Sequence, residues 1–317
     1  MVIPRYPDIA PIDLSMRDCL HPRLSMLPDG VSEFTFAGLY LFRRTYRYHI
    51  SWLPGDKLLV AGEKEGKSFC MLPCGFPDED SLVRELMDRF GFVKGLGESQ
   101  ADTNWIRLER LGLTVQEDRD NFDYLYLKSD LAELSGRKYH KKRNHVNAFI
   151  NNYQFDERPL TTANRDDALM ILDHWQSRRE DRSDYAAARE ALVLFEQLNL
   201  SGYVVYVDGD AAAYTQGEPL MKGRSFVVHF EKAIDDYRGI YQFINKAFAS
   251  ILPRHYIWIN REQDLGDEGL RQSKMTYRPS GFVKKYRVTA AIPQVQEYHP
   301  TPVGAAAGEG SSGDPLH

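Results

Sequence analysis

Basic residues gather in the stretch 259–279, INREQDLGDEGLRQSKMTYRP, although the chain has a net charge of −5. The stretch predicts a strand end, an acidic turn and a helix that Pro279 ends. At about 100° per residue, Lys274 lies between the helix face that packs on the sheet and the face that carries Arg271. A half-sheltered ammonium stabilises a nearby oxyanion more strongly than one in bulk water. We therefore predict Lys274 as catalytic and Arg271 as substrate-binding.

The alternative is that these basic residues lie on a solvent-exposed helix face, where acidic residues four positions away would pair with them. Asp267 stands four residues before Arg271, and it is the one such pair in the stretch. We expect Asp264 to cap the helix. Asn260 and Glu262, at the carboxyl end of the predicted strand, are further candidate substrate-binding residues at the mouth of the same site.

A second candidate group lies in the predicted strand RSFVVHFEKA. Because strand side chains alternate, one side is expected to carry Phe226, Val228 and Phe230, and the other Val227, His229 and Glu231. A neutral histidine there would take a proton from an attacking amine, a role that contributes about 10²–10⁴-fold in rate. His229 and Glu231 are therefore candidate catalytic residues. The alternative is a hydrogen-bonded core histidine beside a glutamate that pairs with a cation.

The turn that follows this strand contains Arg238 and Gly239, which we predict to bind substrate. A glycine lets backbone N–H groups at a helix start approach a pyrophosphate closely. Asp235, Asp236 and Tyr241 surround the turn, and acidic or bulky groups oppose tight coenzyme A binding. The alternative is an ordinary strand-to-helix turn.

A basic connector, GRKYHKKRN, precedes the second half of the chain. Such a cluster in an acidic protein suits phosphates of tRNA, coenzyme A or anionic lipid headgroups. Tyr139 and His140 would stack on a base. The alternative is a solvated helix start. The predicted anion- or nucleic-acid-binding residues are Arg137, Lys138, Lys141, Lys142 and Arg143.

The length, net charge and cysteine content of the chain argue against several classes of protein. The 317 residues suffice for one large domain or two of ordinary size, and the net charge of −5 argues against a nucleic-acid coat protein. Cys19, Cys70 and Cys74 form neither an even set nor a zinc-ligand spacing, so we predict free thiols and no metal site. The sequence offers no apolar leader and no window of 18 apolar residues, which predicts a cytoplasmic protein.

The predicted elements fall into two α+β halves. The first half has a helix over 35–43, a hairpin around Lys64-Glu65-Gly66, a helix over 78–91, and strands over 104–111 and 120–128. The second half has helices over 163–180 and 183–199, a hairpin around Asp208-Gly209, strand 224–233, helix 236–252, strand 255–260, helix 265–277 and strand 281–288. We predict units at 1–136 and 137–297, and a disordered tail at 298–317.

The order of these elements, with VDGDAAAY, FEKAIDDYRGIYQFINKAFA and YIWINREQDLGDEGLRQSKMTYRP, resembles the acyl-CoA N-acyltransferase (GNAT) fold. More specifically, residues 34–288 resemble the family named for the C-terminal domain of phosphatidylglycerol lysyltransferase. The resemblance implies two tandem GNAT-like units, each a mixed, mainly antiparallel twisted sheet flanked by helices. It also implies kinship with Fem-type aminoacyltransferases, which take an aminoacyl group from charged tRNA.

The function predicted on this basis is transfer of an aminoacyl group from aminoacyl-tRNA to an amine or hydroxyl acceptor, a lipid headgroup or a small molecule. No cofactor is required, because the donor is itself a substrate. Peripheral contact with a membrane through the basic cluster is compatible with this function. One alternative is an acyl-CoA-dependent N-acyltransferase, and another is a non-catalytic scaffold that binds tRNA or an anion.

Overall fold

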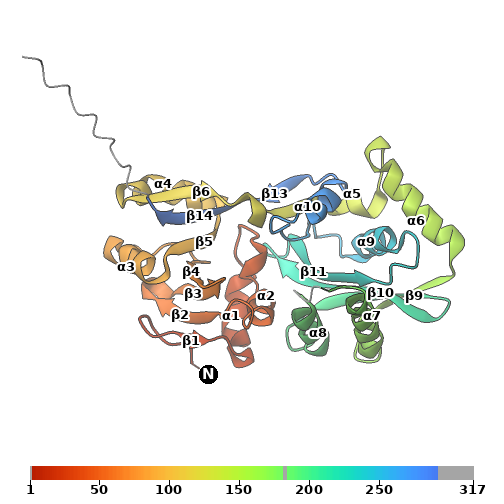
Figure 1. Ribbon diagram of the computed structural model, residues 1–317, viewed down its shortest axis with the longest axis horizontal. Coiled ribbons are helices and arrows are strands. Elements are labelled where there is room, and N and C mark those ends of the chain that lie inside the picture. The colour runs from red at the N-terminus through yellow and green to blue at the C-terminus, as the bar shows by residue number, and fades with distance from the viewer. Residues whose placement is uncertain (1, 181–183, 292–317) are drawn as a thin grey trace, which may run out of the picture.

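Two units lie side by side along the long axis of the molecule, as the computed structural model shows (Figure 1). The structure describes residues 2–180 and 184–291. Each unit is built on a seven-stranded mixed sheet flanked by helices. The predicted fold class, α+β with two tandem GNAT-like units, is confirmed. The predicted disordered tail from residue 298 lies outside the described residues.

The first sheet has the strand order β1-β2-β3-β4-β5-β14-β6, and its pairs are antiparallel except β4 with β5. The helix α2 forms as predicted, because the side chain of Thr35 caps it by accepting from the N–H of Gly38. The strands are β1 (Ala10–Pro11), β2 (His49–Leu53), β3 (Lys57–Lys64), β4 (Lys67–Met71), β5 (Phe92–Gly97), β6 (Leu113–Glu117) and β14 (Lys285–Ala290), and the helices are α1 (Arg17–Leu24), α2 (Phe36–Leu41), α3 (Asp80–Phe90) and α4 (Glu98–Arg110).

The second sheet has the order β13-β7-β12-β11-β10-β9-β8, and only β11 and β12 run parallel. Helices α7 and α8 lie on one face of this sheet and α9 on the other (Figure 1). The strands are β7 (Asp123–Leu127), β8 (Phe155–Pro159), β9 (Ser201–Val207), β10 (Asp210–Leu220), β11 (Ser225–Ala233), β12 (Trp258–Asn260) and β13 (Gly281–Val283), and the helices are α5 (Lys128–Glu133), α6 (His140–Asn152), α7 (Arg165–Ser177), α8 (Tyr185–Val193), α9 (Ile240–Ile251) and α10 (Glu268–Met275).

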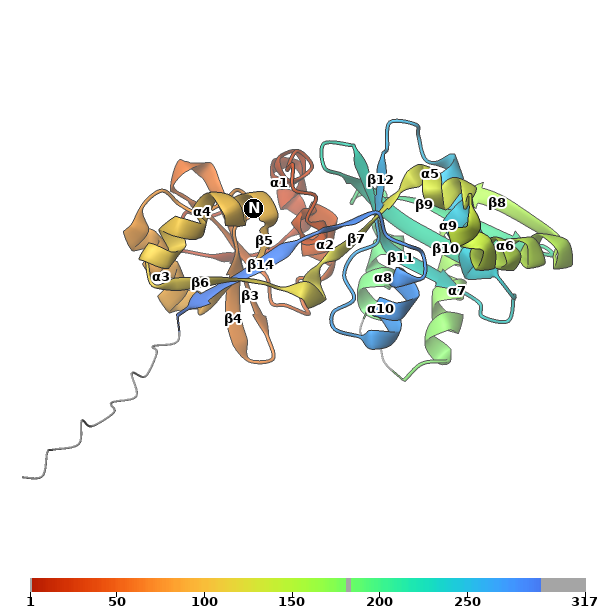
Figure 2. The same ribbon diagram turned by 90° about the horizontal axis from the view of Figure 1, so that it is seen from above.

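The chain crosses between the units twice. It leaves the first sheet after β6 to form β7 in the second sheet, and it returns from β13 to insert β14 between β5 and β6 (Figure 2). The predicted single strand 281–288 is therefore two strands that belong to different sheets. Sheet membership does not follow the predicted boundary at 136/137, because β7 and β14 each pair in the other half.

The hydrophobic cores join the two units. One core combines residues of the first unit such as Phe36 and Phe69 with Leu172, Leu192 and Phe230 of the second. A second core packs α9 and α6 on the other face of the second sheet, and a third packs α3 and α4 on the first sheet. Because one core is shared, the junction between the units is packed like the interior of a domain.

One predicted strand is a helix in the structure. Residues 104–110 of the predicted strand 104–111 lie within helix α4, where Ala101 and Leu108 are buried. Their spacing, with Trp105 between them, follows the helical period rather than the strand period. The basic connector, 136–144, leads into helix α6, the helix start that was its alternative interpretation, and the buried residues of α6 are Val146 and Phe149.

Gly239 allows α6 to pack against the start of α9. Its φ is +89°, and a Cβ at this position would lie 2.2 Å from the carbonyl oxygen of His145 in α6. The close backbone approach that the sequence predicted at Gly239 is therefore made to another helix of the protein. Gly209 has a similar φ of +95° but faces open space, so it provides a matched control.

Replacement of Gly239 by Ala is expected to destabilise the protein by about 3 kcal/mol, from a strained φ plus overpacking against α6. Gly209→Ala should cost about 1–2 kcal/mol, because it carries the backbone strain alone. Urea denaturation measures both. Equal losses would contradict the packing role of Gly239.

Candidate active site

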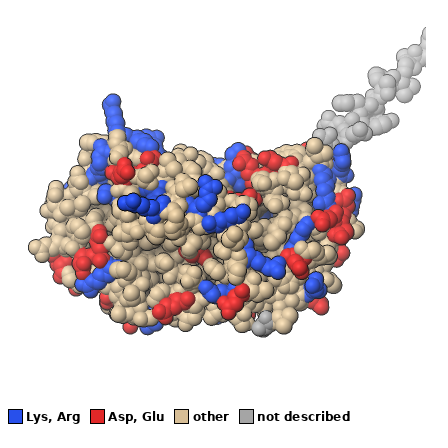
Figure 3. Space-filling model, turned by 180° about the vertical axis from the view of Figure 1, so that it is seen from behind, with Lys and Arg blue, Asp and Glu red and all other residues tan. Residues whose placement is uncertain are grey.

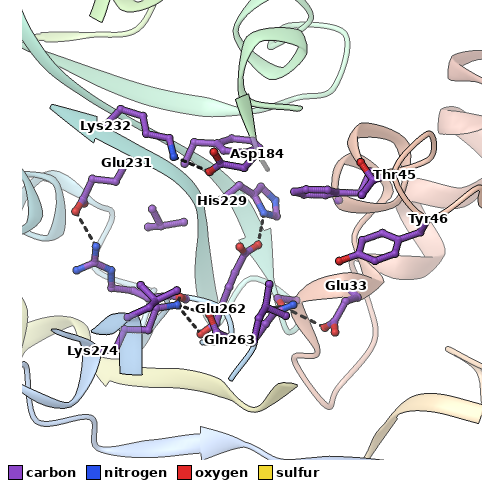
Figure 4. Close-up of a pocket in the computed structure, with 18 of the residues that line it drawn as sticks. Glu33, Thr45, Tyr46, Asp184, His229, Glu231, Lys232, Glu262, Gln263 and Lys274 are labelled. Carbon is purple, nitrogen blue, oxygen red and sulfur yellow. Dashed lines mark hydrogen bonds and ion pairs between the residues drawn. The ribbon is translucent and has the colours of Figure 1, made fainter. Parts of the chain in front are cut away.

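A cavity of about 420 Å³ opens where two parallel strands of the second sheet separate. Strands β11 and β12 pair over three residues, up to Val227 opposite Asn260, after which β11 continues with β10 as its one partner strand among the described residues. Residues of the first unit close the cavity from the other side, so both units line it (Figure 4). Its charged lining residues are Glu33, Lys94, Asp184, His229, Glu231, Lys232, Arg261, Glu262 and Lys274.

His229 is the extra residue of a β-bulge. In the pairing of β10 with β11, Gln216 lies opposite Phe230 and Gly217 opposite Val228, so His229 has no partner on β10. A bulge reverses the alternation of side chains beyond it. Phe226 and Val228 accordingly belong to the core under α9, whereas Phe230 belongs to the core shared by the units. The predicted common side for Phe226, Val228 and Phe230 is thus wrong.

The imidazole of His229 lies between two carboxylates. Its Nδ1 is 2.7 Å from Oε1 of Glu262, and its Nε2 is 3.0 Å from Oε1 of Glu218. The side chain is 2% exposed, and burial acts to lower its pKa, but the two carboxylates outweigh burial and raise the pKa to about 10. His229 is therefore an imidazolium at neutral pH, with both nitrogens donating.

Glu262 presents the other half of its carboxylate to the cavity. Its Oε1 accepts from His229, whereas Oε2 has no partner within residues 2–180 and 184–291. The backbone of Glu262 is held at φ +54°, and its N–H donates to Oδ1 of Asn260 at 2.8 Å. This arrangement fixes a charged, accessible hydrogen-bond acceptor at the mouth of the separated strands.

Glu231 and Lys232 each carry a partner in the cavity wall. Oε1 of Glu231 accepts from Nη2 of Arg261 at 2.7 Å. Nζ of Lys232 lies 2.5 Å from Asp184 and 3.7 Å from the centre of the Trp175 ring. Both ion pairs keep these charges on the wall rather than free in the cavity.

Lys274 reaches the cavity from α10, but its ammonium is fully engaged. Nζ donates to the carbonyl oxygens of Arg261 at 2.6 Å, Glu262 at 3.2 Å and Gln263 at 2.6 Å. Burial lowers its pKa to about 8. Lys274 thus fixes the loop that carries Glu262, and Figure 4 shows it beneath that loop.

Both units contribute to a buried charge cluster beside the cavity. Lys285, at the start of β14, donates to Glu33 and to Asp123, the latter at 2.6 Å, and its side chain is 0% exposed. Asp123 also accepts from Ser32 Oγ at 2.8 Å and from Asn260 Nδ2 at 3.1 Å. The cluster therefore connects β7, β12, β14 and the 3-10 helix Ser32–Phe34 around the cavity.

Four predicted substrate-binding residues do not line the cavity. Asn260 is fully buried and takes part in the charge cluster. Arg271 binds Asp264 and Asp120, each at 2.7–3.0 Å, and these carboxylates raise its pKa. Arg238 and Gly239 lie at the start of α9 and are not among the residues that line the cavity. The helix cap is Asp267, whose side chain accepts from the N–H of Leu270, and not Asp264 as predicted.

The five basic connector residues line a second cavity, which we call the basic groove. It has a volume of about 810 Å³. Lys and Arg gather toward the α6 end of the molecule in the rear view (Figure 3). Within the part of the chain that the structure describes, the side chains of Arg137, Lys141 and Arg278 make no ion pair. The groove is lined by Arg137, Lys138, His140, Lys141, Lys142, Arg143, His145, Thr276 and Arg278.

The basic groove and the cavity meet near Tyr277. Nζ of Lys142, in the groove, lies 3.7 Å from the centre of the Tyr277 ring, and burial lowers its pKa to about 8. Cζ of Arg261, in the cavity wall, lies 5.5 Å from the same ring. The two hollows are therefore neighbours.

Sequence reasoning missed Glu218, Glu33 and Lys94. Glu218 and Glu33 gave no signal, because neither stands in a motif and both act through distant partners. Lys94 carried a weak signal, since Gly95 follows it within a strand, a position typical of a bulge.

Comparison with known proteins places the chain in a family. The family model described as "Phosphatidylglycerol lysyltransferase, C-terminal" matches residues 25–289. The chain belongs to this family. A relative from Mycoplasmoides gallisepticum, an uncharacterized protein, is 27% identical over 199 residues, which are 59% of this chain and 61% of that relative's length.

Solved structures extend the comparison. A conserved protein of unknown function from Bacteroides thetaiotaomicron is 32% identical, with a TM-score of 0.79 over 89% of this chain and 99% of that one. L-PGS from Bacillus licheniformis is 13% identical, with a TM-score of 0.58 over 93% and 96% of the two chains. At that identity the second likeness shows a shared fold. Among the described residues, no helix is long and apolar enough to cross a membrane.

Replacement of His229 by Gln is expected to change how stability depends on pH. Because the pKa of His229 is about 10 in the folded protein and 6.5 ordinarily, the folded state keeps a proton that the unfolded state releases between these values. Stability present below pH 6.5 is thus lost as the pH rises toward 10, by up to about 1.4 kcal/mol per unit.

Urea denaturation at several pH values across this window measures the slope in both proteins. The His229→Gln variant should have a shallower decline than the wild type. His140→Gln, at the exposed start of α6, should keep the wild-type slope. Identical slopes in His229→Gln and wild type would contradict a charged imidazole.

Proposed function

We propose that the protein transfers an aminoacyl group from aminoacyl-tRNA to an amine or hydroxyl acceptor within the cavity. The observation that carries the proposal is the accessible carboxylate of Glu262, held by a charged His229 where β11 and β12 separate. Family membership supports a transferase, and the fold shared with L-PGS is compatible with it.

In the proposed reaction the acceptor attacks the ester carbonyl carbon directly, without a covalent enzyme intermediate. The new C–N or C–O bond forms, and the ester bond to the ribose oxygen of tRNA breaks. Glu262 takes the proton from the attacking group and returns it to the released ribose oxygen, so protons balance.

His229 orients Glu262 in this scheme and does not take the proton itself. An imidazolium with a pKa of about 10 has no free lone pair at neutral pH. Its role is to fix one carboxylate oxygen and leave the other free. Lys274 fixes the backbone of the same residue from below.

The basic groove would hold the phosphates of the donor next to the cavity. Three of its bases, Arg137, Lys141 and Arg278, have charges that no acid neutralises within the described ranges, and phosphate oxygens would pair with them. Because Tyr277 contacts Lys142 of the groove and Arg261 of the cavity wall, the aminoacylated end of a tRNA bound in the groove would lie near the cavity. Acyl-CoA is the less suitable donor, since the turn at Gly239 is occupied by the carbonyl of His145.

Replacement of Glu262 by Gln is expected to lower the transfer rate about 10²–10⁴-fold, because the amide cannot accept the proton. The assay follows radiolabel from a pool of aminoacyl-tRNAs into lipid, peptide or small molecules in cell extract. Glu268→Gln, an exposed carboxylate on α10, is the matched control and should retain activity. Unchanged transfer by Glu262→Gln would remove Glu262 from the reaction, and no transfer by the wild type would favour a binding scaffold.

Replacement of Arg137 and Lys141 by Gln is expected to weaken tRNA binding and to reduce its salt dependence. Each lost phosphate contact lowers the slope of log K against log salt by about one. The matched control is Lys64→Gln with Lys67→Gln, two exposed lysines at the β3–β4 hairpin. Filter binding at several salt concentrations measures the slopes. An unchanged slope in the groove variant would place tRNA elsewhere.

A further inference from the structure

Two charged groups in the cavity have no part in the proposed transfer. Glu33 and Lys94 both line the side of the cavity that the first unit forms. Oε1 of Glu33 is buried and lacks a hydrogen-bond partner in the described part of the chain. Nζ of Lys94 makes neither a hydrogen bond nor an ion pair with any described residue. A carboxylate oxygen and an ammonium thus stand unpaired in one cavity.

Lys94 owes its position to a second β-bulge. In the pairing of β5 with β14, Val93 lies opposite Val288 and Leu96 opposite Tyr286, so Lys94 and Gly95 together face one residue. Gly95 has a φ of +70°, which a residue with a Cβ rarely adopts. Bulges next to active sites redirect side chains. Here the bulge directs a lysine into a sheltered wall.

The surroundings of Lys94 are costly for a lone charge. The residue is 7% exposed, and Nζ lies 5.2 Å from the ring centres of both Tyr46 and Phe69. Burial lowers its pKa, although the charge of Glu33 acts in the opposite direction. A buried ammonium without a hydrogen-bonded counter-ion destabilises a protein, and an apolar side chain of similar size would serve packing better. The position therefore suits an anionic group that a ligand brings.

Glu33 offers the complementary charge. Its Oε2 accepts from Lys285 and lies 3.3 Å from Ser32 Oγ, whose hydrogen is donated to Asp123. Lys285 also donates to Asp123. The carboxylates of Glu33 and Asp123 thus share the ammonium of Lys285, and these three groups together carry one negative charge. Burial acts to raise the pKa of Glu33, but the charges of Lys285 and Lys94 outweigh it and lower the pKa. Glu33 is therefore ionised and suits a cationic donor.

We propose that this wall is a subsite for a zwitterionic α-amino compound, whose carboxylate binds Lys94 and whose ammonium binds Glu33. Phe42, Tyr46 and Tyr48 line the same region and would contact its side chain. The inference rests on the proposed function, in which this compound is the acceptor. Its bound ammonium releases one proton to solvent before the amine nitrogen attacks.

Charge pairing favours a zwitterion over a phosphodiester headgroup. A phosphate would satisfy Lys94, but it would also bring a second negative charge near the ionised Glu33. A free α-amino acid or a dipeptide matches both signs in one small molecule.

Calorimetry of the intact protein without tRNA tests the subsite. The probes are the free L-amino acids, each compared with its carboxamide, which lacks the carboxylate, and its N-acetyl derivative, which lacks the ammonium. Glycerophosphoglycerol represents the headgroup. At least one amino acid should bind about tenfold or more tightly than both of its derivatives. The absence of binding by every amino acid, or tighter binding of glycerophosphoglycerol, would overturn the proposal.

Two variants test which residue binds the carboxylate of the ligand and which binds its ammonium. Lys94→Met should bind acid and carboxamide with equal affinity, and Glu33→Gln should reduce discrimination against the N-acetyl derivative. Lys67→Met and Glu65→Gln, exposed residues of the same unit, should bind like the wild type. If Lys94→Met still prefers the acid, Lys94 is not the anchor. Because no tRNA is present, failure here is distinct from failure of acyl transfer.

A stability measurement keeps the test independent of ligand. Since Lys94 makes no hydrogen bond or ion pair within the described residues, Lys94→Met should fold with a melting temperature close to that of the wild type. Lys285→Met, which leaves two carboxylates unpaired, should melt at a clearly lower temperature. A large loss in Lys94→Met would mean that the ammonium serves the fold, which would overturn the subsite.

Discussion

The structure depends on one buried ammonium that two units share. Lys285 comes from the end of the chain, Glu33 from its beginning and Asp123 from the strand that first crosses between the units. With its charge removed from water, Lys285 requires both carboxylates in place, because breaking a buried pair costs about 3–5 kcal/mol. This requirement fixes the first unit against β7 and β12, and the cavity lies where they meet.

Two bulges give the cavity its chemistry. In regular strands, alternation alone would direct the side chains of His229 and Lys94, either into a hydrophobic core or over a neighbouring strand. One extra residue in β11 and one in β5 redirect them, each toward the same hollow from a different sheet. The positive charge of His229 is then balanced by two carboxylates of the protein, whereas the positive charge of Lys94 is available to a ligand. The two bulges thus place one cation that the protein itself pairs and one cation that a ligand would pair.

Much of the fold could be predicted from the sequence, because periodicity, caps and turn residues act locally. The helix after Thr35, the helix closed by Gly91 and the hairpin at Asp208-Gly209 follow from such signals. The division of 281–288 between two sheets could not be predicted, since nothing local distinguishes a strand that continues from one that changes sheets. Likewise, Lys274 and His229 were found by residue type, but their partners come from distant segments, so their roles could not be read in advance.

The return of β14 to the first sheet has a consequence for how the chain folds. Until residues 285–290 leave the ribosome, β5 and β6 lack the strand that joins them, and Glu33 and Asp123 lack their shared cation. The first half to be synthesised is thus among the last to be completed. A truncation shortly before β14 would leave an open sheet edge that invites pairing with other chains.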